Sequence, residues 1–138
     1  MRVVLDANVL APAFVNLTAS AGRLLAQWRI GTFELIVSEP IPLELHRTYQ
    51  DDYYARRLST ELVDAAIALL RSEALVVEVF VHVSGVATHP EDDLVLATVA
   101  SANADYLGTR DQQLLKLGSF RGSRIIHPAD LTQHIEEI

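Results

Sequence analysis

The chain has 138 residues, of which 50% are hydrophobic and 21% are charged, a balance typical of one ordinary globular domain. Its 11 Lys and Arg residues stand against 18 Asp and Glu residues, and the net charge of −7 argues against binding nucleic acid through a broad basic surface. There is no cysteine and no apolar run near the ~20 residues that span a bilayer, which excludes disulfides, zinc–thiolate sites, thiol catalysis and membrane insertion, and a cytoplasmic protein is expected.

The first part of the chain predicts two strands and two helices in alternation. In chain order we expect a strand at Arg2–Leu5, a helix over residues 18–31, a strand over residues 33–37 and a helix from residue 38 through residue 49. Thr18 and Ser38 are the expected N-caps of the two helices, and Gly31 is the expected stop of the first. Asp6 therefore stands at the carboxyl end of a short buried strand.

The rest of the chain continues the alternation after a break at residues 51–54. We expect an amphipathic helix from Ser59 or Thr60, a strand within residues 74–83, a helix over residues 90–100, a strand over residues 106–109, a helix through residues 114–115, a strand over residues 124–126 and a last helix from residue 128. The side chains expected to face inward from the amphipathic helix are Leu62, Val63, Ala66, Ile67, Leu69 and Leu70.

This order of elements predicts an α/β fold with three layers, in which helices cover both faces of a mainly parallel sheet of roughly five strands. The chain shows no repeat, linker or low-complexity stretch, so residues 1–138 are expected to form a single domain. In such sheets, ligands bind beyond the carboxyl ends of the strands, near the point where the strand order reverses.

Four acids fall at the carboxyl end of a predicted strand or early in the helix that follows it. They are Asp6, Glu44, Asp93 and Asp111. Four carboxylates at one place repel one another, and a hard divalent cation with oxygen ligands relieves that repulsion. The sequence therefore predicts a site for Mg²⁺ or Mn²⁺, where water becomes a better nucleophile and the charge of a phosphate is screened.

Each acid also has a purely structural interpretation. Asp6 and Asp111 suit the N-caps of the helices that follow them. Asp92 and Asp93 suit the first turn of a helix because of the helix dipole, and Glu44 suits a solvated helix surface. Only the convergence of the acids on one edge of the sheet favours the metal site. The five histidines show no metal-binding spacing and are expected at the surface or in loops.

Taken together, these segments resemble the PIN-domain family, in particular its single-domain prokaryotic members, the VapC-like toxins of toxin–antitoxin pairs. The resemblance covers nearly the whole chain. It rests on residues 4–10 (VLDANVL), 38–40 (SEP), 43–45 (LEL), 90–97 (PEDDLVLA), 104–111 (ADYLGTRD), 114–115 (LL) and 125–128 (IIHP), which occur in the family's order.

Carried over position by position, the resemblance implies a catalytic quartet of acids. Its members are Asp6, Glu44, Asp93 and Asp111, of which Asp6, Asp93 and Asp111 would hold the metal. Asn8 and Thr109 match polar positions that support the acids through hydrogen bonds. Asp93 is preferred because its spacing to Leu96 and Ala97 fits the family's helix, and Asp92 is assigned a supporting role in the outer shell.

The function implied by the resemblance is that of a Mg²⁺- or Mn²⁺-dependent endoribonuclease, a hydrolase that cuts phosphodiester bonds in single-stranded RNA. The candidates to guide the RNA backbone are Arg110 and Lys116, together with Arg56, Arg57 and Arg121. The resemblance also implies an antitoxin that occludes the cleft and pairing of two copies of the chain, although the residues themselves show neither. The alternative function is a protein or RNA interaction module, with Tyr49 and residues 51–57 as the partner surface.

Overall fold

The computed structural model describes residues 1–87 and 89–138 and contains one six-stranded sheet. The strands are β1 (Arg2–Leu5), β2 (Glu34–Val37), β3 (Leu75–Val76), β4 (Tyr106–Gly108), β5 (Ser119–Phe120) and β6 (Ser123–Ile126). Their order in the sheet is β3-β2-β1-β4-β6-β5, and every neighbouring pair is parallel except β5 and β6. The expected mainly parallel sheet is confirmed, with six strands instead of five.

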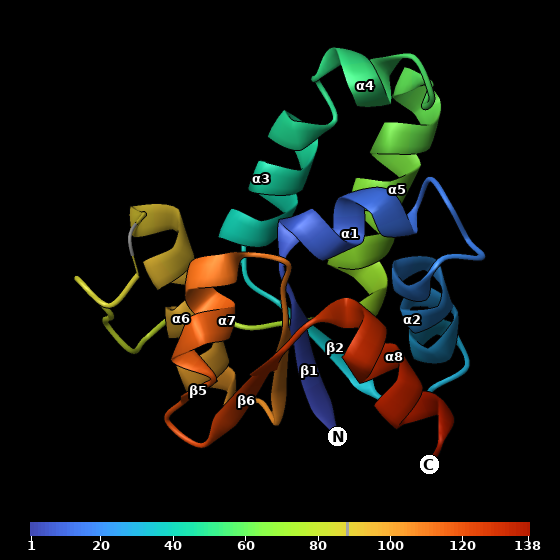
Figure 1. Ribbon diagram of the computed structural model, residues 1–138. Coiled ribbons are helices and arrows are strands. Elements are labelled where there is room, and N and C mark those ends of the chain that lie inside the picture. The colour runs from blue at the N-terminus through green and yellow to red at the C-terminus, as the bar shows by residue number, and fades with distance from the viewer. Residues whose placement is uncertain (88) are drawn as a thin grey trace.

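Helices cover both faces of this sheet, which confirms the three layers. The helices are α1 (Ala7–Ala13), α2 (Ser20–Arg29), α3 (Pro40–Thr48), α4 (Asp52–Ala55), α5 (Thr60–Glu73), α6 (Pro90–Ala102), α7 (Gln112–Leu117) and α8 (Pro128–Glu136). Figure 1 shows α6 and α7 on one side of the strands and α2, α5 and α8 on the other. The helices α3 and α4 lie beyond the carboxyl ends of the strands. Within the described residues, no helix has the length and apolar character needed to cross a membrane.

Two predicted helix caps are wrong, because the side chains find other partners. The helix α2 begins after Ala19, which makes no side-chain cap, while the Thr18 hydroxyl donates to the side chain of Asn16 at 3.0 Å. The Ser38 side chain is buried, and its hydroxyl lies 2.5 Å from the hydroxyl of Thr98 on α6. Ser38 therefore links two elements of the core instead of capping α3.

The predicted cap and apolar face of α5 are confirmed with one exception. The Ser59 hydroxyl accepts a hydrogen bond from the N–H of Leu62, which satisfies an otherwise free donor in the first turn. Val63, Ile67 and Leu70 are buried along one stripe of the helix, as the expected periodicity requires. The side chain of Leu62, by contrast, is 56% exposed, because its position lies off that stripe.

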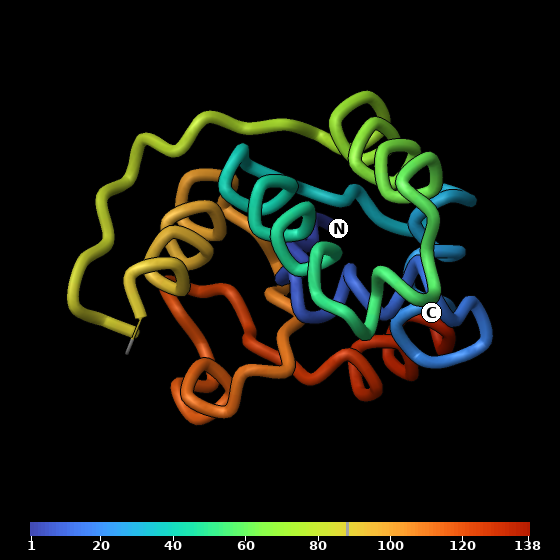
Figure 2. Tube along the Cα trace, turned by 90° about the horizontal axis from the view of Figure 1, so that it is seen from above, coloured from blue at the N-terminus to red at the C-terminus, as the bar shows by residue number. Residues whose placement is uncertain are grey.

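The strand β3 ends at Val76, and residues 77–87 after it form no further strand. Seen from above, residues 77–87 run around the outside of α6 (Figure 2). The backbone N–H groups of Phe80 and Val81 donate to the hydroxyl of Ser101 on α6, at 3.1 and 3.2 Å. The strand expected within residues 74–83 is therefore present but much shorter than the alternating pattern.

The strand order reverses between β1 and β4, the two central strands. From β1 the chain crosses to β2 on one side, whereas from β4 it crosses to β6 on the other. Leu5 is paired with Gly108, and the N–H of Asp6 donates to the Gly108 carbonyl at 2.9 Å. A side chain at Gly108 would lie 2.7 Å from the Leu5 side chain, so a glycine allows this close packing. Asp6 and Thr109 therefore leave the sheet side by side at its switch point.

Candidate active site

Asp6 is the acid at the centre of the switch point, and its carboxylate is almost fully buried, with 3% of the residue exposed. The carboxylate accepts the N–H of Ala7 at 2.8 Å and thereby caps α1. It also accepts the Thr109 hydroxyl at 2.9 Å and, more weakly, the amide of Asn8 at 3.5 Å. Asp6 is thus held from both central strands at once.

Asn8 and Thr109 lie where the sequence placed them, as hydrogen-bonding neighbours of the acids. The Asn8 amide donates to the Thr109 hydroxyl at 3.3 Å, and its carbonyl accepts the N–H of Arg110 at 3.0 Å. The Thr109 hydroxyl accepts the N–H of Asp111 at 3.1 Å, and the Asp111 carboxylate caps α7 by accepting the N–H of Leu114 at 2.9 Å. The capping and site interpretations of Asp111 are therefore compatible.

A polar cleft of about 450 Å³ opens above these residues. It is lined by Asp6, Asn8, Glu44, Arg47, Thr48, Asp51, His89, Glu91, Asp92 and Asp111. Six of these ten lining residues are acids, and Arg47 is the one Lys or Arg among them. The cleft brings together three of the four predicted acids, from the end of β1, from α3 and from the start of α7.

The fourth predicted acid, Asp93, does not reach the cleft. Its carboxylate accepts the backbone N–H groups of Gly85, Val86 and Ala87, at 3.0, 3.2 and 2.7 Å, and 8% of the residue is exposed. These three hydrogen bonds turn the Asp93 carboxylate toward the backbone of residues 85–87 and away from the cleft. Asp92, which the sequence assigned only a supporting role, is the one that lines it.

The reason for this difference lies in the spacing that favoured Asp93. Leu96 and Ala97, three and four residues further along α6, are both buried against the sheet. Val95 and Leu96, three and four residues after Asp92, are buried as well, so this spacing suits both acids and does not show which of them faces the cleft. The prediction that Asp93 joins the cluster is therefore corrected to Asp92.

Burial, and then repulsion between neighbouring acids, raises the pKa values of Asp6, Glu44 and Asp92. Burial raises the pKa of Asp6 to about 6, and repulsion from Glu44 and Asp111 adds to this while the Thr109 hydroxyl opposes it. Burial and the charges of Asp111 and Asp6 likewise raise the pKa of Asp92 to about 6. The pKa of Glu44 is raised by burial and then by Asp92 and Glu91. Ionised together, these carboxylates favour a bound cation.

The donors of the cleft fit a hard divalent cation by their chemistry. Over residues 1–87 and 89–138, no group of three Asp, Glu or His side chains is arranged to hold an ion directly. Mg²⁺ usually keeps several water ligands and takes only one or two carboxylates directly, so carboxylates that line a wider cleft are compatible with such an ion. The carboxylate and amide oxygens of Asp6, Asn8, Asp92 and Asp111 are donors of the type it prefers.

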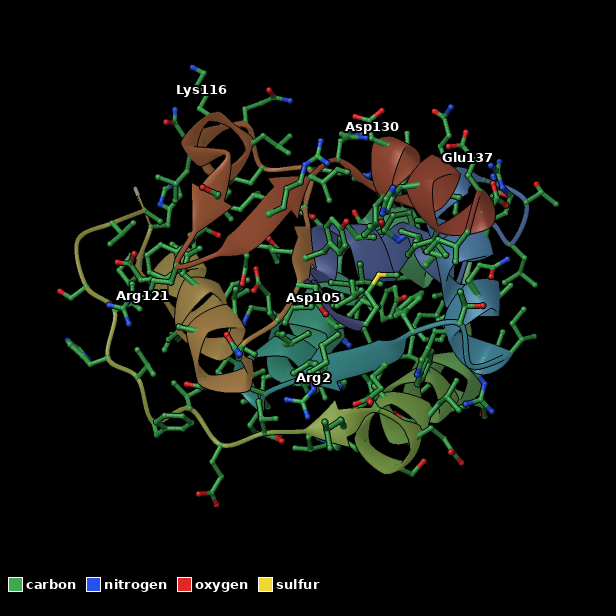
Figure 3. All side chains as sticks on the ribbon, turned by 90° about the horizontal axis from the view of Figure 1, so that it is seen from below. Arg2, Asp105, Lys116, Arg121, Asp130 and Glu137 are labelled. Atoms are coloured by element: carbon green, nitrogen blue, oxygen red, sulfur yellow. The ribbon has the colours of Figure 1, made fainter. Side chains whose placement is uncertain are left out.

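The cations expected to guide RNA occupy different places. Arg110 is exposed next to Thr109, and its charge partly offsets the rise that burial causes in the pKa of Tyr54, as a nearby positive charge does. Lys116 points outward from α7 and does not line the cleft (Figure 3). Arg121 lies in the turn before β6, at the amino end of the sheet, where Arg2 and Asp105 also lie (Figure 3). Of these three, only Arg110 is near the acids.

Comparison with known proteins agrees with this fold. The fold and the cleft define a doubly wound α/β domain with acids at its switch point, and a family model described as "PIN domain" matches residues 2–113. The chain belongs to the PIN-domain family. A search of curated proteins finds no significant match to the sequence.

Two solved structures share the fold over most of their length. VapBC2 from Rickettsia felis, bound to a DNA fragment from its promoter, matches with a TM-score of 0.64 and 13% identity over 92% of this chain and 98% of its own. VapC20 from Mycobacterium tuberculosis, a Sarcin–Ricin loop cleaving toxin, matches with a TM-score of 0.59 and 16% identity. The match covers 88% of this chain and 98% of the VapC20 chain. At these identities the likeness establishes the fold alone.

Proposed function

We propose that the chain is a ribonuclease dependent on a divalent metal ion, which cuts single-stranded RNA in the acidic cleft. Its working carboxylates would be Asp6, Glu44, Asp92 and Asp111. One observation carries the proposal: the switch point gathers these acids in one cleft, although burial and mutual repulsion raise the pKa values of three of them. Such an arrangement costs stability, and it is typical of a functional site rather than of a structural one.

A bound metal ion would relieve the repulsion among these carboxylates. Asp6, Asp92 and Asp111 would hold Mg²⁺ or Mn²⁺, with Asn8 and Thr109 fixing the orientation of the acids. When bound, such an ion makes water a better nucleophile and neutralises charge on the phosphate. No thiol or serine nucleophile is required for this chemistry, which suits a chain without cysteine.

The protein side chains contribute position and proton transfer. The network through Thr109 holds Asp6 and Asp111 in fixed places on neighbouring strand ends, so the reacting groups would be aligned without reorganisation. Glu44 lies on the facing wall of the cleft, on α3. Its raised pKa suits it to accept a proton from the attacking water on a carboxylate oxygen.

The relatives support a role as the toxin of a toxin–antitoxin pair. The M. tuberculosis relative cleaves the Sarcin–Ricin loop, and the R. felis relative is a VapBC2 assembly. By analogy, the partner of this chain would be an antitoxin that covers the cleft. Pairing of two copies of the chain stays a prediction from the family resemblance.

The proposal is tested by the cleavage of a labelled single-stranded RNA in Mn²⁺ and in EDTA. We expect cleavage by the wild type in Mn²⁺ only. Asp92→Asn should slow it by about 100-fold or more, the size expected when a group that acts in the reaction is lost. Asp93→Asn is the matched control, since it removes the same charge one residue away, and it should keep most of the activity at temperatures where it is folded.

Two results would contradict the proposal. Cleavage that persists in EDTA, or that Asp92→Asn leaves unchanged, would remove the acidic cleft from the mechanism. A wild type that binds Mn²⁺ but cuts neither single-stranded RNA nor a structured ribosomal RNA would favour the alternative, an interaction module without nuclease activity.

A further inference from the structure

We propose that α3 and α4 form a track that holds single-stranded RNA beside the cleft, where Arg47 contacts a phosphate and the stacked pair of Tyr53 and Arg57 contacts an unpaired base. The inference rests on the proposed function and adds to it the path by which the substrate leaves the cleft. Neither Arg47 nor Tyr53 is part of the acidic quartet.

Arg47 supplies the fixed positive charge in a cleft that otherwise repels RNA. It lies on α3 one turn after Glu44, and both residues line the cleft. The charge of Arg47 partly offsets the rise that burial and the neighbouring acids cause in the pKa of Glu44. It takes part in none of the three ion pairs that the described residues form. A guanidinium can bind two phosphate oxygens at once, so Arg47 is suited to hold the RNA backbone against the surrounding acids.

Tyr53 and Arg57 form a flat, exposed surface beyond Arg47. Tyr53 lies on α4 and is 56% exposed. The Arg57 guanidinium lies 3.7 Å from the centre of the Tyr53 ring, and its Nη1 donates to the Tyr53 carbonyl at 2.6 Å. Unpaired bases stack on aromatic rings and on guanidinium planes, and this pair offers both in a fixed arrangement.

The stacked pair stands on a row of aromatic rings that begins in the core. The buried Tyr49 donates its hydroxyl to the Ala11 carbonyl at 2.9 Å. Its ring meets that of Tyr54 edge-on with centres 5.2 Å apart, and Tyr54 meets Tyr53 in the same way at 4.9 Å. Covering the core explains Tyr49 and Tyr54, but it does not explain the exposed Tyr53. The row holds Tyr53 in place, so little freedom is lost when a base binds.

The track is continuous with the cleft. Asp51 lines the cleft and is the N-cap residue of α4, so the two meet directly. The N–H of Arg110 donates to the side chain of Asn8, which lines the cleft. Burial raises the pKa of Tyr54 and the charge of Arg110 partly offsets this rise, so Arg110 also lies near the base of the aromatic row. Arg47 and Arg57 beside the exposed ring of Tyr53 offer positive charge and a stacking surface together, which favours a single-stranded nucleic acid over a second protein as the occupant.

The test is binding of a fluorescein-labelled single-stranded A12 RNA, measured by fluorescence anisotropy with the full chain carrying Asp92→Asn to prevent cutting. In this background, adding Tyr53→Ala should weaken binding by about tenfold, the loss expected when one stacked base is released. Adding Tyr53→Phe keeps the ring and should leave the affinity unchanged. Adding Phe80→Ala removes an aromatic residue that is 77% exposed outside the cleft lining, and it should also have no effect.

Salt and duplex controls separate the two parts of the track. Arg47→Ala should reduce the slope of log affinity against log salt by about 0.7, the value for one phosphate contact on a single strand. The A12·U12 duplex should not respond to Tyr53→Ala, because its bases are already stacked. Circular dichroism and the melting temperature check that each variant is folded, which is expected for changes at exposed positions.

An A12 affinity that Tyr53→Ala leaves unchanged would overturn the proposal. The proposal would also be overturned if Tyr53→Ala left RNA binding intact but changed the mass of the assembly measured by sedimentation. The surface would then be an interface with another protein chain. Because binding is read without cutting, a failure of the track is distinguishable from a failure of the nuclease, which shows in the Mn²⁺-dependent cleavage by the wild type.

Discussion

The buried charge of Asp6 should destabilise the fold in the absence of metal, and Asp6→Asn removes that charge with little change in shape. Burial, with Glu44 and Asp111 nearby, raises the Asp6 pKa from 3.8 to about 6. This difference corresponds to about 3 kcal/mol of unfolding free energy lost at pH 8. Asparagine keeps an acceptor for the Ala7 N–H, and disturbing the Thr109 hydrogen bond costs about 1 kcal/mol. The variant should therefore be more stable by about 2 kcal/mol at pH 8.

Urea unfolding in EDTA, followed by the fluorescence of the single, buried Trp28, measures this difference. At about pH 4.5 the gain should vanish, because Asp6 is then mostly protonated in the native wild type and carries no charge. Millimolar Mn²⁺ should stabilise the wild type and leave Asp6→Asn largely unaffected, since the ion binds only the native site. A variant that is less stable than the wild type at pH 8 would refute the reasoning, because the charge would then not be the source of the cost.

Three further predictions follow from the same geometry. Asp93→Ala removes the acceptor of three backbone N–H groups, so it should lower the unfolding free energy by about 2–4 kcal/mol and speed hydrogen exchange at residues 85–87. Mn²⁺ should still stabilise this variant, and unchanged hydrogen exchange at residues 85–87 would contradict the role of Asp93. The unfolding free energy should fall as the pH rises from about 4 to about 6 in EDTA, because over this range the native state binds more protons than the unfolded chain, at the raised pKa values of Asp6 and Asp92. Millimolar Mn²⁺ should flatten this pH dependence, and an unfolding free energy that does not change with pH in EDTA would contradict the raised pKa values. Gly22→Ala should cost about 3 kcal/mol in urea unfolding, because its Cβ would lie 2.2 Å from the Asn16 carbonyl oxygen; a loss below about 1 kcal/mol would show that the neighbouring loop yields easily.

Much of the fold could be predicted because its main elements carry strong local patterns. The strand β1 is an apolar run whose Val3, Val4 and Leu5 are all buried, and runs of this kind are typical of a central parallel strand. Alternation with amphipathic helices then implied a doubly wound sheet, and the carboxyl ends of β1 and β4 indicated the edge where the site lies. These inferences depend on residues that are close in sequence.

The elements that were missed carry weak or conflicting patterns. The helix α1 begins at Ala7, directly after its N-cap Asp6, and contains Pro12, a residue that usually breaks a helix. The sequence allowed Asp6 to cap a following helix, but it placed that helix only from residue 18. The strand β5 is only two residues long and joins β6 through a turn in which Arg121 and Gly122 both have positive φ. A tight two-residue turn of this type is normally marked by Asn-Gly or Asp-Gly, and arginine in the first position conceals it.

The error in the site has a different cause. Asp92 and Asp93 are adjacent carboxylates at the start of one helix, so composition and helix propensity treat them alike. Which of them faces the cleft depends on how α6 is rotated against the sheet and on the N–H groups of residues 85–87, which bind Asp93. Those contacts arise only in the folded chain, and the apolar spacing along α6 could not distinguish the two positions.

The metal site is tested most directly by locating Mn²⁺, from its anomalous scattering, in crystals of the wild-type protein soaked in that ion. We expect an anomalous peak in the acidic cleft, between the carboxylates of Asp6, Asp92 and Asp111. A peak beside Asp93 and the backbone of residues 85–87, or no peak in the cleft at all, would contradict the claim that the acids at the switch point form the metal site of a nuclease.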